Sequence, residues 1–183
     1  MSYCTAIATM KPTDKLVHQN YHDNHYGFAI QHDDELFCRL VLEINQAGLS
    51  WTTILNKEAN FRKAYHNFAI KKIANYKQHD IERLLNNAGI IRNKLKIHAA
   101  IHNANAILTI QKKEGSFKNW LDKNHPLQKA EWVKLFKTVF KFTGGEIVGE
   151  FLMSTGYLEG AHDADCTIFK KAQLFNKKVQ ICV

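Results

Sequence analysis

Proline, glycine and long apolar runs are all scarce in this sequence of 183 residues. Two prolines and nine glycines exclude collagen-like and low-complexity chains, which contain far more of both. No run approaches the roughly 18 consecutive apolar residues that a membrane-spanning helix needs, and the first residues lack the order of charge and hydrophobicity found in secretory signals. We therefore expect a soluble, cytoplasmic protein that does not enter a membrane.

Cysteines are also few, and acidic residues are fewer than basic ones. A chain of this length can bury a hydrophobic core without covalent cross-links, and in a reducing compartment its four cysteines are expected to be thiols or metal ligands. Seventeen acidic residues against 25 basic ones give a formal net charge of +8. This excess favours a polyanionic partner, either nucleic acid or an anionic membrane surface.

Apolar residues recur with a helical period along most of the chain. The pattern predicts helices at about 33–46, 80–88 and 93–111, a short helix capped by Ser116 that ends at Trp120, and another between Gly144-Gly145 and Gly156. Asp33 and Asp34 are the expected caps of the first of these. Both prolines, at 12 and 126, are expected in loops. The sequence therefore predicts an all-α protein.

Glu43 falls on the apolar face of the predicted helix 33–46. Leu36, Leu40, Glu43 and Ala47 follow the i, i+4, i+7, i+11 spacing of one helical face. Burying a carboxylate is costly unless a cation or a ligand meets it, so both an internal salt bridge and a functional role are open. The run Gln-Ala-Gly-Leu-Ser-Trp at 46–51 places a glycine turn and an aromatic side chain nearby, which is typical of a base-binding pocket.

The connection between the predicted helices 80–88 and 93–111 reads Gly-Ile-Ile-Arg-Asn-Lys from residue 89. Glycine lets the backbone approach a phosphate, and the start of a helix offers unpaired N–H groups and a positive dipole. Arg92, Lys94 and Lys96 add positive charge. The pattern is typical of a helix-hairpin-helix element that contacts the DNA backbone, although an ordinary helical hairpin has the same spacing.

His162 and Cys166 are separated by three residues and could bind one zinc ion. Cys4 and an N-terminal histidine would complete a tetrahedral site of two cysteines and two histidines. Ten histidines and four cysteines make chance matches common, so spacing alone does not separate this site from unrelated polar residues. Asp163 and Asp165 are alternative ligands for a different metal.

Five segments of the sequence are informative together. They are Tyr-His-Asp-Asn-His-Tyr-Gly at 21–27, Leu-Glu at 42–43 followed by Gln-Ala-Gly-Leu-Ser-Trp at 46–51, Asn-Ala-Gly-Ile-Ile-Arg at 87–92, Phe-Lys-Phe at 140–142 and His-Asp-Ala-Asp-Cys at 162–166. In content and order these segments resemble the 3-methyladenine DNA glycosylase I family. The resemblance covers the chain up to about Cys166. It implies a helical, helix-hairpin-helix DNA repair enzyme with one structural zinc that joins the N- and C-terminal regions.

The resemblance also implies a role for each matched position. It implies the zinc ligands Cys4, His22, His162 and Cys166, the catalytic residue Glu43, the base-binding residues Tyr21 and Trp51, a DNA-inserting turn at Gly48 and Leu49, and a phosphate-binding hairpin with Gly89, Ile91, Arg92 and Lys94. The implied reaction hydrolyses the N-glycosidic bond of 3-methyladenine flipped out of double-stranded DNA and leaves an abasic site. No lysine lies in the matched pocket motifs, so we expect no lyase activity.

The implied molecule is a monomer with a single domain over 1–183, built as two helical lobes around one cleft, with a divergent basic tail at 167–183. The sequence departs from the family at Ala6, where tryptophan is usual, and at residues 25–26. A second hypothesis is therefore a non-catalytic, zinc-stapled DNA-binding module derived from the same fold. Both hypotheses predict salt-dependent DNA binding, but only the enzyme releases free 3-methyladenine.

Overall fold

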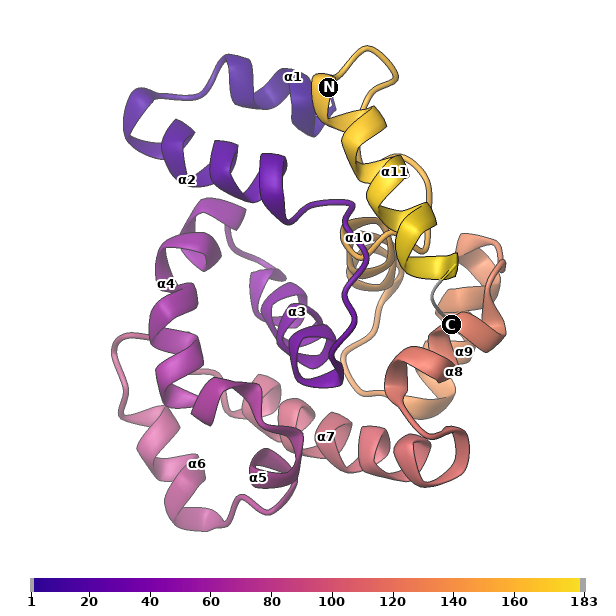
Figure 1. Cartoon of the computed structure of the whole chain (residues 1–183). Coiled ribbons are helices and arrows are strands. Elements are labelled where there is room, and N and C mark those ends of the chain that lie inside the picture. The colour runs from indigo at the N-terminus through magenta and orange to yellow at the C-terminus, as the bar shows by residue number, and fades with distance from the viewer. Residues whose placement is uncertain (1, 182–183) are drawn as a thin grey trace. The chain divides into compact units, whose positions relative to one another are not determined.

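Helices are the regular secondary structure of this protein. The computed structural model describes residues 2–181, and none of these residues forms a β-strand, so the predicted all-α class is confirmed. No helix in this range is both long and apolar enough to cross a membrane. The chain divides into two compact units (Figure 1): one combines the residues up to Ile30 with those from Gly149 onward, and the other spans Gln31–Val148.

The first unit contains α1 (Tyr3–Ala8), α2 (Pro12–Asn24), the end of α10 (Gly145–Ser154) and α11 (Thr167–Ile181). Pro12 is the first residue of α2, where its missing N–H costs no helical hydrogen bond. The loop predicted at this proline is therefore wrong. The predicted tail 167–183 is helical through Ile181, and its last two residues lie outside the described residues.

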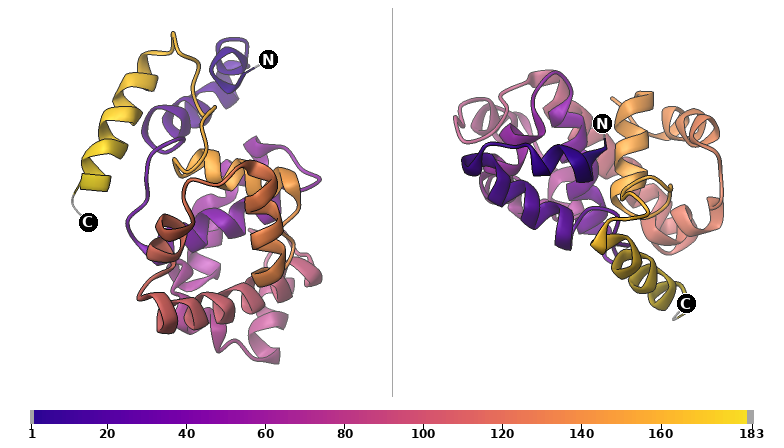
Figure 2. Two further views of the ribbon diagram at one scale, coloured as in Figure 1. Left: turned by 90° about the vertical axis from the view of Figure 1, so that its right-hand side faces the viewer. Right: turned by 90° about the horizontal axis from the view of Figure 1, so that it is seen from above.

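α11 lies beside the extended chain that follows α2 (Figure 2). The Asn176 side chain connects the two segments: its Nδ2 donates to the Gly27 carbonyl at 2.9 Å, and its Oδ1 accepts from the Ala29 N–H at 2.8 Å. The ring of Phe175 packs edge-on against that of Phe28, with centroids 5.6 Å apart. The tail region is thus docked on its own unit by specific contacts.

The second unit contains most of the helices. They are α3 (Asp33–Gln46), α4 (Trp51–Ala64), the 3-10 turn η1 (His66–Phe68), α5 (Ile70–Ala74), α6 (Gln78–Leu85), α7 (Lys94–Glu114), α8 (Phe117–Asn124), α9 (Lys129–Val139) and the start of α10. Each helix predicted from periodicity in this range corresponds to one of these. The ends differ, because α6 begins and ends earlier than predicted, whereas α7 and α8 extend further.

α3 forms the centre of the second unit and packs against α4, α5, α7 and α8 (Figure 1). Every residue from Leu36 to Asn45 is buried, since the helix is covered on several sides. Next to it, rings from α8, α9 and the following chain form an aromatic cluster of Phe117, Trp120, Trp132, Phe136 and Phe140. The helices packed around α3 therefore hold Glu43 in a fixed position within the second unit.

Asp33 and Asp34 cap helices other than the one they begin. The N-cap of α3 is His32, without a side-chain hydrogen bond, so the predicted capping role is wrong. Asp33 instead accepts from the N–H groups of Phe117 and Lys118 at 2.7 and 3.0 Å, at the start of α8. Asp34 accepts from the Ile70 N–H at the start of α5, at 3.1 Å. Each carboxylate meets the positive end of another helix dipole.

Candidate functional site

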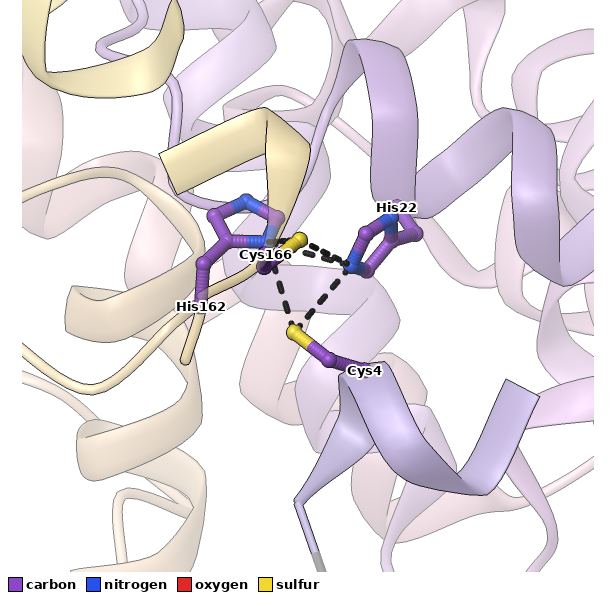
Figure 3. Close-up of side chains that lie close together, drawn as sticks. All are labelled: Cys4, His22, His162 and Cys166. Atoms are coloured by element: carbon purple, nitrogen blue, oxygen red, sulfur yellow. Dashed lines mark hydrogen bonds between the residues drawn. The ribbon is translucent and has the colours of Figure 1, made fainter. Parts of the chain in front are cut away.

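The four predicted metal ligands converge in the first unit (Figure 3). Cys4 comes from α1, His22 from α2, and His162 and Cys166 from the chain that leads into α11. Their ligand atoms all lie within 4.8 Å of one another. The structure therefore brings together residues more than 130 positions apart into a group that could hold a metal ion.

The spacing of the ligand atoms suits a single tetrahedral ion. The Cys4 Sγ lies 3.3 Å from the His22 Nε2, which lies 3.1 Å from the His162 Nδ1, and the Cys166 Sγ is 3.6 Å from the His22 Nε2. Zinc bonds of about 2.0–2.3 Å in tetrahedral geometry require ligand separations of roughly 3.3–3.8 Å. The observed separations run from 3.1 Å between the two imidazole nitrogens to 3.9 Å between the Cys166 Sγ and the His162 Nδ1, which is close to that range.

Hydrogen bonds on the far side of each ring determine which histidine nitrogen faces the centre. The His162 Nε2 lies 2.8 Å from the Tyr26 carbonyl oxygen. A carbonyl can only accept, so this nitrogen carries the proton and Nδ1 presents a lone pair to the centre. The His22 Nδ1 lies 2.7 Å from Asp23 Oδ1, which leaves its Nε2 to face the centre. Burial also lowers the pKa of His162, which favours the neutral ring that metal binding requires.

Sequence reasoning missed Asp23, which orients a predicted ligand. Burial opposes its ionisation, but hydrogen bonds from His22 and Gln19 outweigh that effect and lower the pKa of Asp23. The Gln19 amide donates to both carboxylate oxygens at 2.8 Å. A carboxylate behind a metal-bound histidine is the usual second partner of such a ligand. Its position directly after His22 in the sequence was the available signal.

Glu43 is buried in α3, with 4% of its surface exposed, as its place on the apolar face predicted. Trp51, the first residue of α4, is half-buried in the same unit. Tyr21 is 5% exposed, but it belongs to α2 in the first unit. A pocket formed by these three residues therefore stays a prediction.

The turn 47–50 between α3 and α4 is held by its own hydrogen bonds. Gly48 adopts a φ of +83°, a backbone conformation that residues other than glycine rarely adopt. The Leu49 N–H donates to the Gln46 carbonyl at 2.7 Å, and the Gln46 side-chain amide donates back to the Leu49 carbonyl at 3.0 Å. Leu49 itself is 39% exposed. The turn thus exposes the apolar side chain of Leu49 on a backbone that hydrogen bonds hold in place.

The hairpin 86–93 joins α6 to α7, so the structure has a short connection between two helices where the sequence predicted one. The Asn87 Oδ1 accepts from the Gly89 N–H at 2.8 Å, and Asn93 caps α7 by accepting from the Lys96 N–H at 3.1 Å. A Cβ on Gly89 would lie 3.0 Å from that Asn87 oxygen and 3.3 Å from atoms of Asn60, so a larger residue there would crowd both side chains. Ile91 is half-buried, while Arg92 and Lys94 are exposed and free to meet solvent or an anion.

Lys96 does not join those exposed charges, and the interpretation of it as part of a basic phosphate-facing set is wrong. It is 6% exposed, and its Nζ donates to the carbonyls of Asn45 and Ala47 at 3.0 and 2.7 Å. Burial lowers its pKa. A signal was present: Lys96, Ala100, Asn103 and Ile107 follow the same i, i+4, i+7, i+11 spacing that singled out Glu43.

A separate groove of about 550 Å³ lies among α7, α8 and α9 in the second unit. Its lining includes His102, Trp120 and Val139. None of the residues predicted to bind the base, the DNA or a metal lines it. The groove is therefore not the predicted site.

Comparison with known proteins identifies the family. The sequence profile described as "Methyladenine glycosylase" matches residues 11–134. This span covers more than half of the chain and contains the turn and the hairpin. The chain belongs to this family.

Named relatives resemble the chain over most of their length. It is 34% identical over 168 residues to DNA-3-methyladenine glycosylase 1 of Escherichia coli (strain K12), covering 81% of this chain and 89% of the relative. It is 33% identical over 172 residues to DNA-3-methyladenine glycosylase of Haemophilus influenzae, covering 84% and 92%. The fold also resembles that of 3-methyladenine DNA glycosylase I from Staphylococcus aureus, with a TM-score of 0.76, 30% identity and coverage of 89% and 94%. That last structure concerns recognition of 3-methyladenine by the Staphylococcus enzyme.

Proposed function

We infer that this protein is a DNA repair glycosylase that hydrolyses the N-glycosidic bond of 3-methyladenine in DNA and leaves an abasic site. Family membership carries this conclusion, because the relatives named for the activity match this chain over more than 80% of its length. The positive formal charge of +8 agrees with a polyanionic substrate. The non-catalytic alternative has no comparable support.

The chemistry of the lesion suits the proposed residues. An adenine methylated at N3 is cationic and a good leaving group, so the enzyme must chiefly extract the base from the duplex and hold it. Aromatic faces at Tyr21 and Trp51 would attract the cationic base by about 0.5–2 kcal/mol each. The carboxylate of Glu43 would oppose its positive charge and hydrogen-bond its amino edge. Both interactions favour the methylated base over neutral adenine.

In this proposal the turn 47–50 and the hairpin 86–93 engage the DNA. An exposed leucine behind a glycine can enter the base stack and occupy the space that the flipped base leaves. The exposed side chains of Arg92 and Lys94, beside the N–H groups at the start of α7, suit contacts with phosphates. Such contacts bind the duplex without reading its sequence.

The metal group is proposed to hold one zinc ion with a structural role. Cys4, His22, His162 and Cys166 would supply all four ligands. Four protein ligands leave no position for water, so a bound ion cross-links α1, α2 and the chain before α11. The protein residues, and not the metal, then carry the chemistry on the base.

Incubation of the protein with methylated duplex DNA tests the proposed function. We expect free 3-methyladenine among the released bases, and strands that break only after alkali treatment, because a monofunctional enzyme leaves the abasic site intact. Binding of the duplex without release of any base would favour the DNA-binding module instead.

A further inference from the structure

Two lysines connect the turn 47–50 to the hairpin 86–93. Lys96, in the first turn of α7, donates to the carbonyls of Asn45 and Ala47. Lys57, in α4, donates in the opposite sense to the carbonyls of Ala88 and Gly89 at 3.2 and 3.3 Å. Each lysine therefore lies in the helix that follows one element and reaches the backbone of the other.

Lys96 completes the hydrogen bonding at the end of α3. The last carbonyls of a helix have no partner within it, and the negative end of the helix dipole attracts a cation. Lys96 meets the carbonyls of Asn45 and Ala47, and the Leu49 N–H meets the carbonyl of Gln46 between them. Three successive carbonyls are thus bonded, so the backbone that presents Leu49 has little freedom.

A buried lysine at position 96 does not stabilise α7 itself. A cation in the first turn of a helix faces the positive end of its dipole, and burial of an ammonium group removes it from water. The contacts that use the charge of Lys96 are those to the end of α3 and the turn.

We propose that Lys96 is a positioning residue that holds the Leu49 turn in a fixed place relative to the phosphate-binding hairpin. The proposal rests on the DNA-engaging roles proposed above for these two elements. A side chain that enters a base stack must disrupt stacking and base pairing. A flexible turn would be displaced by the bases instead of separating them. Small misplacements far from the reacting bond can reduce rates strongly.

Lys96→Met tests this proposal, because methionine keeps the length and apolar character of the side chain but cannot donate. The matched control is Lys112→Met, an exposed lysine in the last turn of the same helix. We expect Lys96→Met to lower the single-turnover excision rate at saturating enzyme at least tenfold, while its affinity for undamaged duplex changes less than twofold. Lys96→Arg, which retains a charged donor, should recover part of the rate.

A fluorescence measurement separates positioning from a general loss of structure. A duplex with a stable abasic analogue next to 2-aminopurine should brighten when the turn enters the stack. The native protein and Lys112→Met should give this signal, whereas Lys96→Met and Leu49→Ala should lose most of it. The double variant Lys96→Met/Leu49→Ala should excise no more slowly than the slower single variant, because both changes disable one step.

The outcomes separate the proposed role of the Leu49 turn from the role of Lys96. If Leu49→Ala excises at the native rate, the proposed role of the turn fails, and the role of Lys96 fails with it. If Leu49→Ala is impaired but Lys96→Met excises within twofold of the native rate, or if the two defects multiply, only the inference about Lys96 is overturned. Should Lys96→Met unfold at the assay temperature, Lys96→Leu, which also lacks a donor, replaces it at a temperature where it is folded. An undiminished fluorescence signal would then contradict the proposal.

Discussion

Asp23→Asn is predicted to weaken the metal site without removing a ligand. The His22 Nδ1 lies 2.7 Å from the Asp23 carboxylate, and asparagine keeps an oxygen at similar length while removing the charge. Loss of such an outer partner lowers metal affinity by about 10- to 100-fold, or about 1.4–2.7 kcal/mol. Competition with a chromogenic zinc chelator would measure this change.

The same change predicts a metal-dependent loss of stability. A ligand that binds only the folded state stabilises it in proportion to the logarithm of its affinity. In excess zinc, the whole loss of metal-binding free energy should therefore appear as a loss of unfolding free energy. One kcal/mol shifts the melting temperature of a chain this size by about 2–4 °C, so we expect a decrease of about 3–10 °C in zinc and a much smaller one in chelator. Asp165→Asn, an exposed neighbour of the site, is the control. An equal loss with and without chelator would refute the assigned role of Asp23.

Three further outcomes follow from the geometry. Cys166→Ser should lower bound zinc well below one ion per chain by elemental analysis, and an unchanged content would exclude it as a ligand. Zinc affinity should fall as the pH decreases from 8 to 6, because protons compete for the thiolates and imidazoles that bind the metal; a pH-independent affinity would argue against this ligand set. Gly89→Ala should cost about 1–3 kcal/mol of unfolding free energy in denaturant titrations, since its Cβ would crowd Asn87 and Asn60. Gly144→Ala, where a Cβ meets nothing within 4 Å, should cost less, and equal costs would contradict the packing argument.

Local patterns predicted α3, α6, α7, α8 and α10 and the burial of Glu43, because these follow from apolar periodicity along one segment. They gave no bounds for α1, α2, α4, α5 or α9. The proposed metal ligands were harder to predict: Cys4 and Cys166 lie near opposite ends of the sequence, and only the family resemblance selected His22 among ten histidines. The fold then brought all four together. Residue spacing predicts which side chains share one face of a helix, whereas the group of Cys4, His22, His162 and Cys166 forms only through tertiary contacts.

Charged residues at helix starts were the main source of error. Asp33 and Lys96 both looked like local features, a cap and a surface charge. Each instead bonds backbone groups of another helix, Phe117 for Asp33 and Asn45 for Lys96. Hydrogen bonds to a distant backbone do not depend on the partner's side chain, so the sequence does not identify the partner. For Lys96, spacing on the buried face of its helix indicated burial but not the carbonyls that it meets. A pocket of Tyr21, Glu43 and Trp51 stays a prediction, because these residues belong to two units.

Release of 3-methyladenine by Glu43→Gln, compared with the native protein under single-turnover conditions, tests the catalytic role proposed for Glu43. The control is Glu159→Gln, which removes an exposed carboxylate and should leave the rate unchanged. Removing the charge at residue 43 should slow release on the order of 100-fold, with folding and binding of undamaged DNA retained. Release by Glu43→Gln at the native rate would contradict the account of the base-binding site.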